Sequence, residues 1–490
     1  MDYDVIISGG GPVGLMLACE LGLQGVRVAV LERLAEIDQT IKAGSVNTPT
    51  AEAFYRRGLL PALEEAQEHT MVAFRQFMAQ GGEKPKPPSF AGHFAALWLK
   101  GDHVDEDDPA FADRGPAARL VGVRQQDIEH LLGVRAAELG VEVLRGVELT
   151  GFEAAADEVT VHAGDRELRC RWLVGCDGGR STVRSVAGFE FPGTPPMITG
   201  HQAIVTMEGA ERLGVGWTHT DTGIYVHGPV PGRILTVEFD GPPEDRTTPV
   251  TAQELQASLR AVSGVDVTIT EVKTATRFTD NARQVTTYRL GRVLLAGDAA
   301  HVHSPFGGQG LNLGIGDAVN LGWKLAAVIQ GRSPEALLDT YTAERHPIGA
   351  WVLDWTRAQV LLMRPEARSR ALRAIVSDLV DTVAGTTYFV KKISGVSQRY
   401  DLPGDHPLIG RSAPDLELAD GSRLADHLRQ GRGLLLDLGA GLDHARVPVL
   451  AAKPVDARDF SGLLVRPDGI VAWAGNAPDA ALEEALATWF

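Results

Sequence analysis

A glycine-rich segment with two histidines and one acid is the part of this chain best suited to chemistry. The segment GDAAHVHSPFGGQG runs from Gly297 to Gly310 and includes Asp298, His301 and His303. Such a segment can form a turn, a metal site or a cofactor cradle. A metal site needs further Cys, His or acidic ligands, and no such pattern accompanies the two histidines. We therefore predict no metal site and interpret His301 as a hydrogen-bonded structural residue of the loop.

The elements on either side of this segment favour a cofactor cradle. The apolar run Val293 to Ala296 predicts a strand, and apolar residues at helical spacing from 311 to 328 predict a helix. Asp298 then stands at a strand end, where it can accept hydrogen bonds from a ribityl chain. Gly308 and Gly310 let the backbone approach a planar ring. The positive end of the helix suits the N1–C2=O edge of a reduced, anionic isoalloxazine, so the segment predicts a flavin cradle.

The N-terminus also carries a glycine motif. A short strand, a glycine turn, a helix and a second strand are predicted in residues 5–31, and Glu32 ends the second strand. A G-x-G-x-x-G fingerprint fills the turn, and its members are Gly9, Gly11, Pro12, Val13 and Gly14. The glycines allow a tight turn, close approach of a pyrophosphate and close helix–strand packing, while Glu32 can bind a ribose hydroxyl. The motif predicts dinucleotide binding without distinguishing NAD from FAD.

One more motif, RWLVGCDGGRSTVRSVAG, lies between these two. The strand Trp172 to Gly175 is followed by Asp177, and a helix is expected after Ser181. Either Asp177 or Ser181 can cap that helix. Arg184, within the helix, can form a salt bridge with a nearby acid. By itself the motif predicts only a strand end and a capped helix.

Together, the three motifs resemble those of the group A FAD-dependent aromatic monooxygenases, which share the para-hydroxybenzoate hydroxylase fold. In chain order, the first motif is the fingerprint at Gly9, the second is DGGRSTVR at Asp177 and the third is GDAAHVHSPFGGQGLN at Gly297. The resemblance covers essentially the whole chain. It implies FAD as cofactor and NADPH or NADH as a transient reductant that uses no second fingerprint. It also implies that O2 adds to reduced FAD to give a C4a-hydroperoxide, whose distal oxygen goes to an electron-rich ring.

The resemblance further implies individual FAD contacts. Arg33 matches a position beside the adenosine. Lys42, in IKAG, matches the basic residue at the pyrophosphate, where an arginine is usual and a lysine acts as a point charge. Gln125, with Arg124 beside it, matches the start of an FAD-binding helix. The other implied contacts come from the second and third motifs and are Asp177, Gly178, Pro305, Leu311 and Asn312. Of these, Pro305 flanks the flavin ring, and Leu311 and Asn312 offer backbone N–H groups to its O2 edge.

A roof over the flavin is expected between the second and third motifs. The alternating segments HQAIVTM, GIYVHGPV and RILTVEFD predict an antiparallel sheet, which lines the substrate cavity in the resembled family. Phe90 to Leu99 is expected to add one strand and a cavity wall. Four residues are cavity candidates, none of them identified as a catalytic base: His93, Trp217, Tyr225 and His227.

The substrate follows from what this roof lacks. Neither a tyrosine pair for a small hydroxybenzoate nor an arginine clamp for a carboxylate is recognisable, which favours a larger, less charged substrate. The chain resembles bacterial aromatic-polyketide tailoring hydroxylases, so we predict hydroxylation of a polycyclic aromatic phenol with O2. The same fold permits Baeyer–Villiger insertion or oxidative inactivation of an antibiotic. A non-catalytic redox sensor or ligand-sequestering protein is the less favoured alternative.

The expected fold class is α/β, in three parts. These are a Rossmann-like FAD-binding domain (1–75, 118–187 and 275–395), an antiparallel β-sheet substrate domain (76–117 and 188–274) and a C-terminal α/β domain (396–490). The last resembles the thioredoxin-like domain of phenol hydroxylases and polyketide hydroxylases. Because it has no cysteine, it cannot perform dithiol chemistry, which leaves structural support or homodimerisation.

Composition excludes some partners. The net charge of -16 over 490 residues would repel nucleic acid. No basic leader precedes the first strand, and no run approaches the about 20 apolar residues of a membrane span. Three cysteines without C-x-x-C spacing indicate reduced core thiols. We therefore expect a cytoplasmic protein that binds neither nucleic acid nor membranes.

Overall fold

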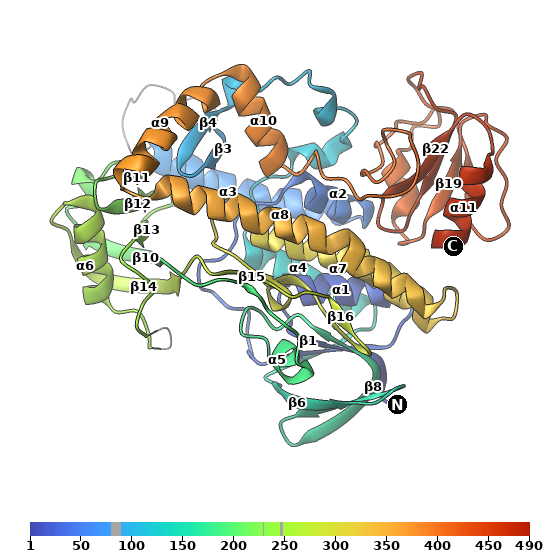
Figure 1. The fold of residues 1–490 in the computed structure, drawn as a ribbon, viewed down its shortest axis with the longest axis horizontal. Helices are drawn as coiled ribbons and strands as arrows, with labels where there is room; N and C mark the ends of the chain where they lie inside the picture. Colours follow the sequence, from blue (N-terminus) through green and yellow to red (C-terminus); the bar gives the residue numbers. More distant parts are fainter. Residues whose placement is uncertain (80–89, 229, 246–247) are drawn as a thin grey trace.

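A twisted, mostly parallel sheet forms the base of the molecule (Figure 1). The computed structural model describes residues 1–79, 90–228, 230–245 and 248–490. In it the sheet has the order β16-β17-β8-β1-β2-β5, with β16 antiparallel to β17 and the hairpin β6–β7 attached to β8. The strands are β1 (Tyr3–Ser8), β2 (Val28–Glu32), β5 (Glu142–Arg145), β6 (Leu149–Ala154), β7 (Val159–Ala163), β8 (Arg166–Gly175), β16 (Arg289–Leu290) and β17 (Val293–Leu295). Central β1 buries the apolar run Val5 to Ile7, as expected for a strand that is covered on both faces.

Helices cover this sheet, and α1 packs between α4 and α7. The helices of this region are α1 (Pro12–Leu23), α2 (Thr48–Arg56), α3 (Leu60–Ala79), α4 (Gln125–Glu138), α5 (Thr182–Ala187) and α7 (Gln309–Ile329). Three short strands, β9 (Gly193–Thr194), β15 (Ala282–Gln284) and β18 (His301–Val302), form a small sheet that leads toward the roof. The predicted strand–turn–helix units around Gly9 and Gly297 are thereby confirmed.

A five-stranded antiparallel sheet forms the roof, in the order β11-β12-β13-β10-β14. Its strands are β10 (Thr199–Glu208), β11 (Gly216–His219), β12 (Gly223–His227), β13 (Arg233–Glu238) and β14 (Thr268–Phe278). Helix α6 (Ala252–Ser263), which the sequence interpretation missed, packs on one face. The other face contributes Ile224, Val226 and Leu235 to a core shared with Phe306 of the glycine-rich loop.

The segment after residue 89 differs from its prediction. Instead of one strand, the chain forms a hairpin of β3 (Phe90–Phe94) and β4 (Leu97–Lys100). Ala95 and Ala96 turn the chain with φ of 51° and 63°, values uncommon for residues other than glycine. The sequence also predicts an exposed loop at the Pro/Lys stretch 83–88, and this stretch lies outside the described residues.

The C-terminal part is a mixed α/β unit with its own core. Its sheet has the order β20-β19-β21-β22, with β19 parallel to β20 and antiparallel to β21. The elements are β19 (Leu434–Asp437), β20 (Val449–Ala451), β21 (Gly462–Val465), β22 (Val471–Gly475) and α11 (Ala480–Trp489). This agrees with the predicted fold class, and the exact domain boundaries stay a prediction.

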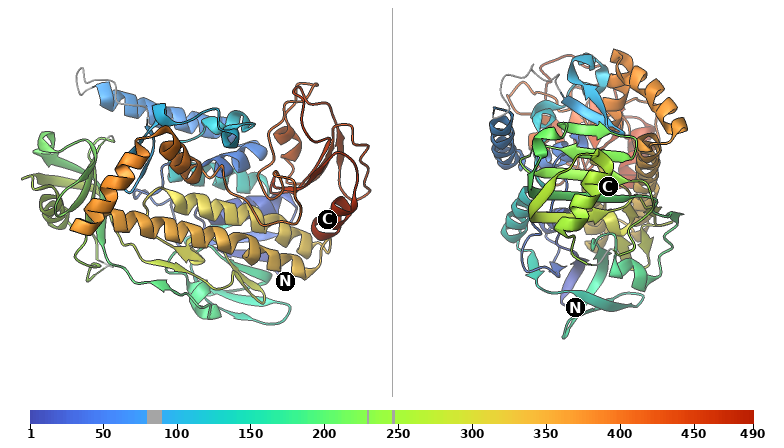
Figure 2. Two further views of the ribbon diagram at one scale, coloured as in Figure 1. Left: turned by 45° about the horizontal axis from the view of Figure 1, so that its top comes forward. Right: turned by 90° about the vertical axis from the view of Figure 1, so that its left-hand side faces the viewer.

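Long helix α8 (Asp339–Met363) runs lengthwise through the molecule, with the roof at one end and the C-terminal unit at the other (Figure 2). The helices α9 (Ala367–Val380) and α10 (Val383–Ile393) return from its roof end. Helix α10 packs on the β3–β4 hairpin, so the chain from α8 onward connects both ends of the molecule.

Buried ion pairs dock the C-terminal unit. The Arg466 guanidinium donates to both carboxylate oxygens of Glu344 on α8, at 2.9 and 2.8 Å, and lies 4.4 Å from the Trp489 ring. Asp468 accepts from the same guanidinium. Since Arg466 is fully buried, its charge persists only because these carboxylates meet it.

Replacing Arg466 tests the strength of this docking. Arg466→Met leaves two buried carboxylates without their main cation, so we expect the free energy of unfolding to fall by about 3–5 kcal/mol. Urea unfolding of the flavin-loaded protein measures it. The control is Arg429→Met, because Arg429 is exposed in its pair with Asp426, and this change should cost at most about 1 kcal/mol. An equal loss of unfolding free energy in the two variants would contradict a special contribution of the buried ion pair to stability.

Candidate active site

Two of the three fingerprint glycines occupy positions that leave no room for a side chain. Gly9 has φ of +107°, and a Cβ there would lie 2.3 Å from the Cys176 carbonyl oxygen. A Cβ on Gly14 would lie 2.0 Å from the Gly9 carbonyl oxygen, whereas one on Gly11 would meet nothing within 4 Å. Gly9 and Gly14 therefore close the strand–turn–helix unit. Gly11 faces open space, as the approach of a pyrophosphate requires.

Glu32 is held at the end of β2 by two backbone donors. Its Oε2 accepts from the Gly10 N–H at 2.7 Å and its Oε1 from the Leu34 N–H at 2.8 Å. Each carboxylate oxygen keeps a further lone pair, so the fixed side chain can still accept from a ribose hydroxyl. Arg33 beside it is exposed, and its contact with adenosine stays a prediction.

Asp177 and Ser181 both cap α5. Asp177 accepts from the backbone N–H groups of Thr182 and Val183 at 2.8 and 3.1 Å, and the Ser181 hydroxyl accepts from the Arg184 N–H at 2.9 Å. Burial raises the pKa of Asp177. Its carboxylate is thus oriented by the helix, and Gly178, at φ of +81°, makes the turn before it.

Arg184 ties the second motif to the third, and it does so without an acid. Its guanidinium donates to the carbonyl oxygens of Ala299 and Gly179, at 3.0 and 2.8 Å. The salt bridge considered from sequence is therefore replaced by hydrogen bonds to two carbonyl groups. These bonds hold the DGGR turn against the Gly297 turn.

Val13 brings the first and third motifs together. A Cβ on Gly297 would lie 3.1 Å from its Cγ2, and one on Gly314 would lie 2.5 Å from the same atom. The first and second motifs meet where the Cys176 N–H donates to the Ser8 carbonyl at 2.7 Å. All three predicted motifs are thus neighbours, although the chain separates them by more than a hundred residues.

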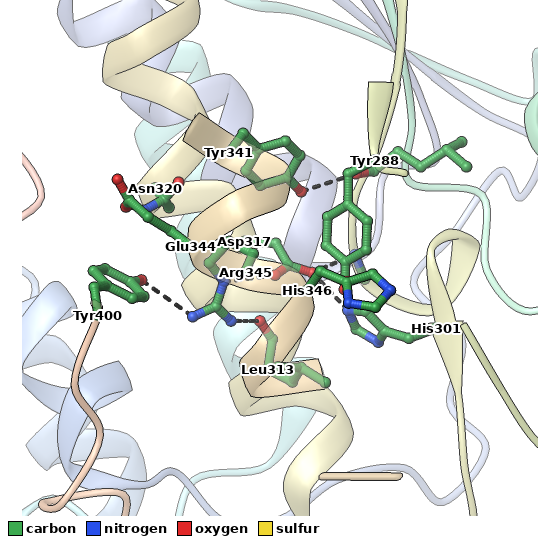
Figure 3. A network of polar contacts seen from close by, with 12 residues as sticks. Tyr288, His301, Leu313, Asp317, Asn320, Tyr341, Glu344, Arg345, His346 and Tyr400 are labelled. Atoms are coloured by element: carbon green, nitrogen blue, oxygen red, sulfur yellow. Dashed lines mark hydrogen bonds and ion pairs between the residues drawn. The ribbon is translucent and has the colours of Figure 1, made fainter. Parts of the chain in front are cut away.

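A buried carboxylate, Asp317, lies in a network of polar contacts with His301 and Arg345 (Figure 3). Asp317 of α7 accepts from the Gly297 N–H at 3.0 Å, pairs with His301 Nε2 at 2.7 Å and accepts from Arg345 Nε at 2.8 Å. The His301 and Arg345 charges hold the pKa of Asp317 below its usual range against the effect of burial. His301 is fully buried, so its predicted structural role is confirmed.

Helix α7 begins inside the loop without a side-chain cap. Gly308 is its N-cap at φ of +64°. Asn312 fixes this start, since its side chain donates to the Gly308 carbonyl at 2.8 Å and accepts from the Asn47 N–H at 2.8 Å. Leu311 is buried beside it, while Asp298 and Pro305 are exposed. The free N–H groups of α7 therefore remain available to an anionic or carbonyl edge.

The predicted pyrophosphate side is formed by α4 and the IKAG segment. The Gln125 N–H donates to the Ala43 carbonyl at 2.9 Å, which places the start of α4 beside this segment. Lys42 pairs with Asp38 at 3.0 Å, and Arg124 donates to Asp127 at 2.8 and 2.7 Å. Lys42 and Arg124 are thus each paired with an aspartate of the chain. The FAD contacts of Lys42, Arg124 and Gln125 stay predictions.

The arrangement fits FAD. Helices α1 and α7 both begin at glycines without a side-chain cap, and uncapped helix N-termini bind phosphate and anionic groups. Gly11 leaves room beside the first of these. The chain offers no comparable cradle for a metal: across the described ranges, no three His, Cys, Asp or Glu side chains gather as ligands.

The roof brings some of the cavity candidates together and excludes others. The His93 and Trp217 rings lie 4.6 Å apart, and Trp217 is 6.2 Å from Phe306 of the loop. Tyr225 points to the opposite face, where it packs in the core under α6 and accepts from the Gly214 N–H at 3.1 Å. His227 lies two residues after Tyr225 on β12, so strand alternation places both side chains on the same face of the sheet. The expectation that these two line the flavin side is corrected.

Two residues of the flavin-facing side were missed. His219 shares this face with Trp217 and bonds the Ala95 carbonyl at 3.2 Å. Arg233 shares it with Leu235, two residues along β13. Burial, with a smaller effect of nearby arginines, lowers the pKa of His93 and of His219 to about 4. The sequence signal for both residues was their spacing: His219 is two residues from Trp217 and Arg233 is two residues from Leu235, and such pairs share one face of a strand.

Comparison with known proteins agrees with this geometry. Residues 2–356 match the FAD binding domain family, and residues 406–490 match the C-terminal domain of aromatic-ring hydroxylases. The chain therefore belongs to the FAD-binding aromatic-ring hydroxylase family, and it is a flavin-dependent aromatic monooxygenase.

Individual relatives include enzymes named for tetracycline intermediates, for rifampicin and for angucycline biosynthesis. The chain is 42% identical to the 12-dehydrotetracycline 5-monooxygenase/anhydrotetracycline 6-monooxygenase of Streptomyces rimosus, covering 100% of this chain and 99% of that protein. It is 41% identical to the rifampicin monooxygenase of Streptomyces venezuelae, covering 100% and 98%. The crystal structure of CabE, an aromatic hydroxylase from angucycline biosynthesis, is 36% identical and superposes with a TM-score of 0.85 over 100% of this chain and 99% of that one. Within the described part of the chain, no helix is long and apolar enough to span a bilayer.

Gly14 provides a direct test of the cofactor site. Gly14→Ala places a methyl group against the Gly9 carbonyl, so strand and helix must separate, and we expect FAD affinity to fall about tenfold or more. Fluorescence titration of the apoprotein with FAD measures this. Gly133→Ala on α4 is the matched control, because its Cβ meets nothing and it should leave FAD affinity unchanged. Unaltered affinity in both variants would argue against the site.

The buried His93 predicts a pH dependence of stability. Its folded pKa of about 4 lies below the unfolded value of about 6.5, so between these values the unfolded chain binds more protons. Stability should therefore fall as the pH drops through this window, by at most about 3 kcal/mol from His93. Urea midpoints between about pH 7 and about pH 5 should show a shallower slope in His93→Gln. His130→Gln, at an exposed position, should keep the wild-type slope, and an unchanged slope in His93→Gln would refute the assignment.

Proposed function

We propose that this monooxygenase uses NADPH or NADH and O2 to hydroxylate a polycyclic aromatic polyketide-type phenol. The observation that carries the proposal is the wall of large rings between roof and loop. Trp217 of the roof and Phe278 of β14 lie 6.2 and 5.9 Å from Phe306. Aromatic walls of this kind suit a flat, fused ring system.

The residues of the chain bind and orient the reactants. Bound FAD would accept hydride from the nicotinamide and activate O2, and this is the chemistry that a cofactor supplies. The α1 N-terminus would hold the pyrophosphate, Glu32 a ribose hydroxyl, and the α7 N-terminus the N1–C2=O edge of the ring. The apolar face with Ile224, Val226 and Leu235 excludes water from the space above the loop.

Two further statements belong to this proposal. The chain divides functionally into the FAD-binding, substrate and C-terminal domains expected from sequence. The C-terminal domain, which has no cysteine, either supports the FAD-binding domain or provides the contact through which the chain forms a homodimer. The three thiols are unpaired, in keeping with a cytoplasmic enzyme.

The test follows NADPH oxidation by the purified flavoprotein, with and without a panel of anthraquinone-, angucycline- and tetracycline-type phenols. Product masses are read from the same reactions. We expect at least one compound to stimulate NADPH oxidation and to gain one oxygen atom. Stimulation without oxygen gain would show hydrogen peroxide release and argue against this substrate class. No stimulation by any member would favour a sensor or sequestering role.

The rifampicin monooxygenase relative supports a second candidate, oxidative inactivation of an antibiotic. Rifampicin is therefore included in the panel. Its oxidation in place of the polyketide phenols would assign the chain to that function, and the structure of the product would separate ring hydroxylation from ring insertion.

A further inference from the structure

Arg233 carries a charge for which the described part of the structure provides no partner. It opens β13 opposite Ile204 of β10, and strand alternation places it on the same side as Leu235 of the flavin-facing core. The residue is half-buried, and its Nε is fully buried without a hydrogen bond. Burial lowers its pKa, and no ion pair with a carboxylate is found for it among the described residues.

The neighbours of Arg233 on this side cannot neutralise it. His93 is close enough for the guanidinium to add to the effect of burial on its pKa, which keeps the imidazole uncharged at neutral pH. Its Nδ1 is also buried without a partner. Beyond it lies the Trp217 ring, 4.6 Å from the imidazole. The ring that Arg233 acts on is therefore a neutral imidazole, and that imidazole lies beside an indole.

Among the described residues, three buried arginines donate to carboxylates, and a fourth, Arg184, is met by the Ala299 and Gly179 carbonyls. Arg57 donates to both oxygens of Glu20 at 2.7 and 2.8 Å. Arg345 donates to Asp317 at 2.8 Å and Arg466 to Glu344 at 2.9 Å. A partly desolvated cation without a counter-charge lowers stability. Such a cost is typical of binding sites, where the ligand supplies the missing group.

We propose that Arg233 binds an ionised oxygen of the substrate, a phenolate, enolate or carboxylate at the edge of its ring system. It thereby selects acidic aromatic compounds over neutral ones. This inference rests on the proposed function in so far as the substrate lies under the roof. The neutral imidazole of His93 can form one further hydrogen bond to the same edge, and Trp217 offers a ring face. The sequence-based expectation of a less charged substrate is changed accordingly.

Two pairs of anthraquinones test the selection. Emodin and physcion differ only in the methylation of one acidic hydroxyl, and anthraquinone-2-carboxylate and its carboxamide differ in charge. Binding to the oxidised holoenzyme, without NADPH, is followed by the change in flavin absorbance. In at least one pair we expect the wild-type protein to bind the acidic member about tenfold more tightly. Arg233→Met should remove this preference by weakening the acidic member, and Arg233→Lys should retain part of it.

Controls separate binding from folding. Arg212→Met changes an exposed arginine of the same region and should leave the preference intact. The melting temperature of Arg233→Met should equal or exceed that of the wild type, because an unpaired charge is removed. Absence of any preference in the wild type, an unchanged preference in Arg233→Met or a lower melting temperature would each overturn the proposal. Because no turnover is involved, a charge preference without oxygen transfer would refute the proposed function while leaving this inference standing.

Discussion

A buried carboxylate must be met by donors, and that requirement at Asp317 organises the centre of this molecule. The Gly297 N–H, His301 and Arg345 supply those donors. Together they fix the turn after β17, the strand β18 and the helices α7 and α8 relative to one another. Arg345 also bonds the Leu313 carbonyl and the Tyr400 hydroxyl. The uncapped start of α7 therefore has its position because a single buried charge on the same helix is met by three donors from separate parts of the chain.

Local spacing was sufficient for the cofactor-binding framework. The turns at Gly9 and Gly297 are encoded within a few residues, since a strand end, a glycine and a helix start need only short-range contacts. The roof was harder to predict. The turn at Ala95 and Ala96 uses alanines at positive φ, for which no residue type gave a signal. The sequence did contain a signal for helix α6, because Leu255, Leu259 and Val262 are helically spaced and the Thr251 hydroxyl accepts from the Glu254 N–H. This signal was missed because the whole region was expected to be sheet.

The candidate site shows where sequence reasoning reaches its limit. Strand β12 is buried on both faces from 223 to 226, so alternation could not reveal that Tyr225 faces α6 while Trp217 faces the loop. The Asp317–Arg345 pair spans 28 residues and has no local pattern. Likewise, Arg233 resembles any surface arginine until the lack of an acid around it is known. Such features depend on which distant segments meet, and only the folded chain supplies that information.

The docking of the C-terminal unit has a consequence for evolution. Arg345, Glu344 and Arg466 place paired charges on both sides of the boundary, and Arg57 reaches across it to the Leu428 and Pro467 carbonyls. Two enzymes of this family could exchange C-terminal domains only if these side chains matched, because a mismatch would strand a charge where water cannot reach it. The boundary between the C-terminal unit and the rest of the chain is therefore specific to each protein, and the two parts are expected to diversify together.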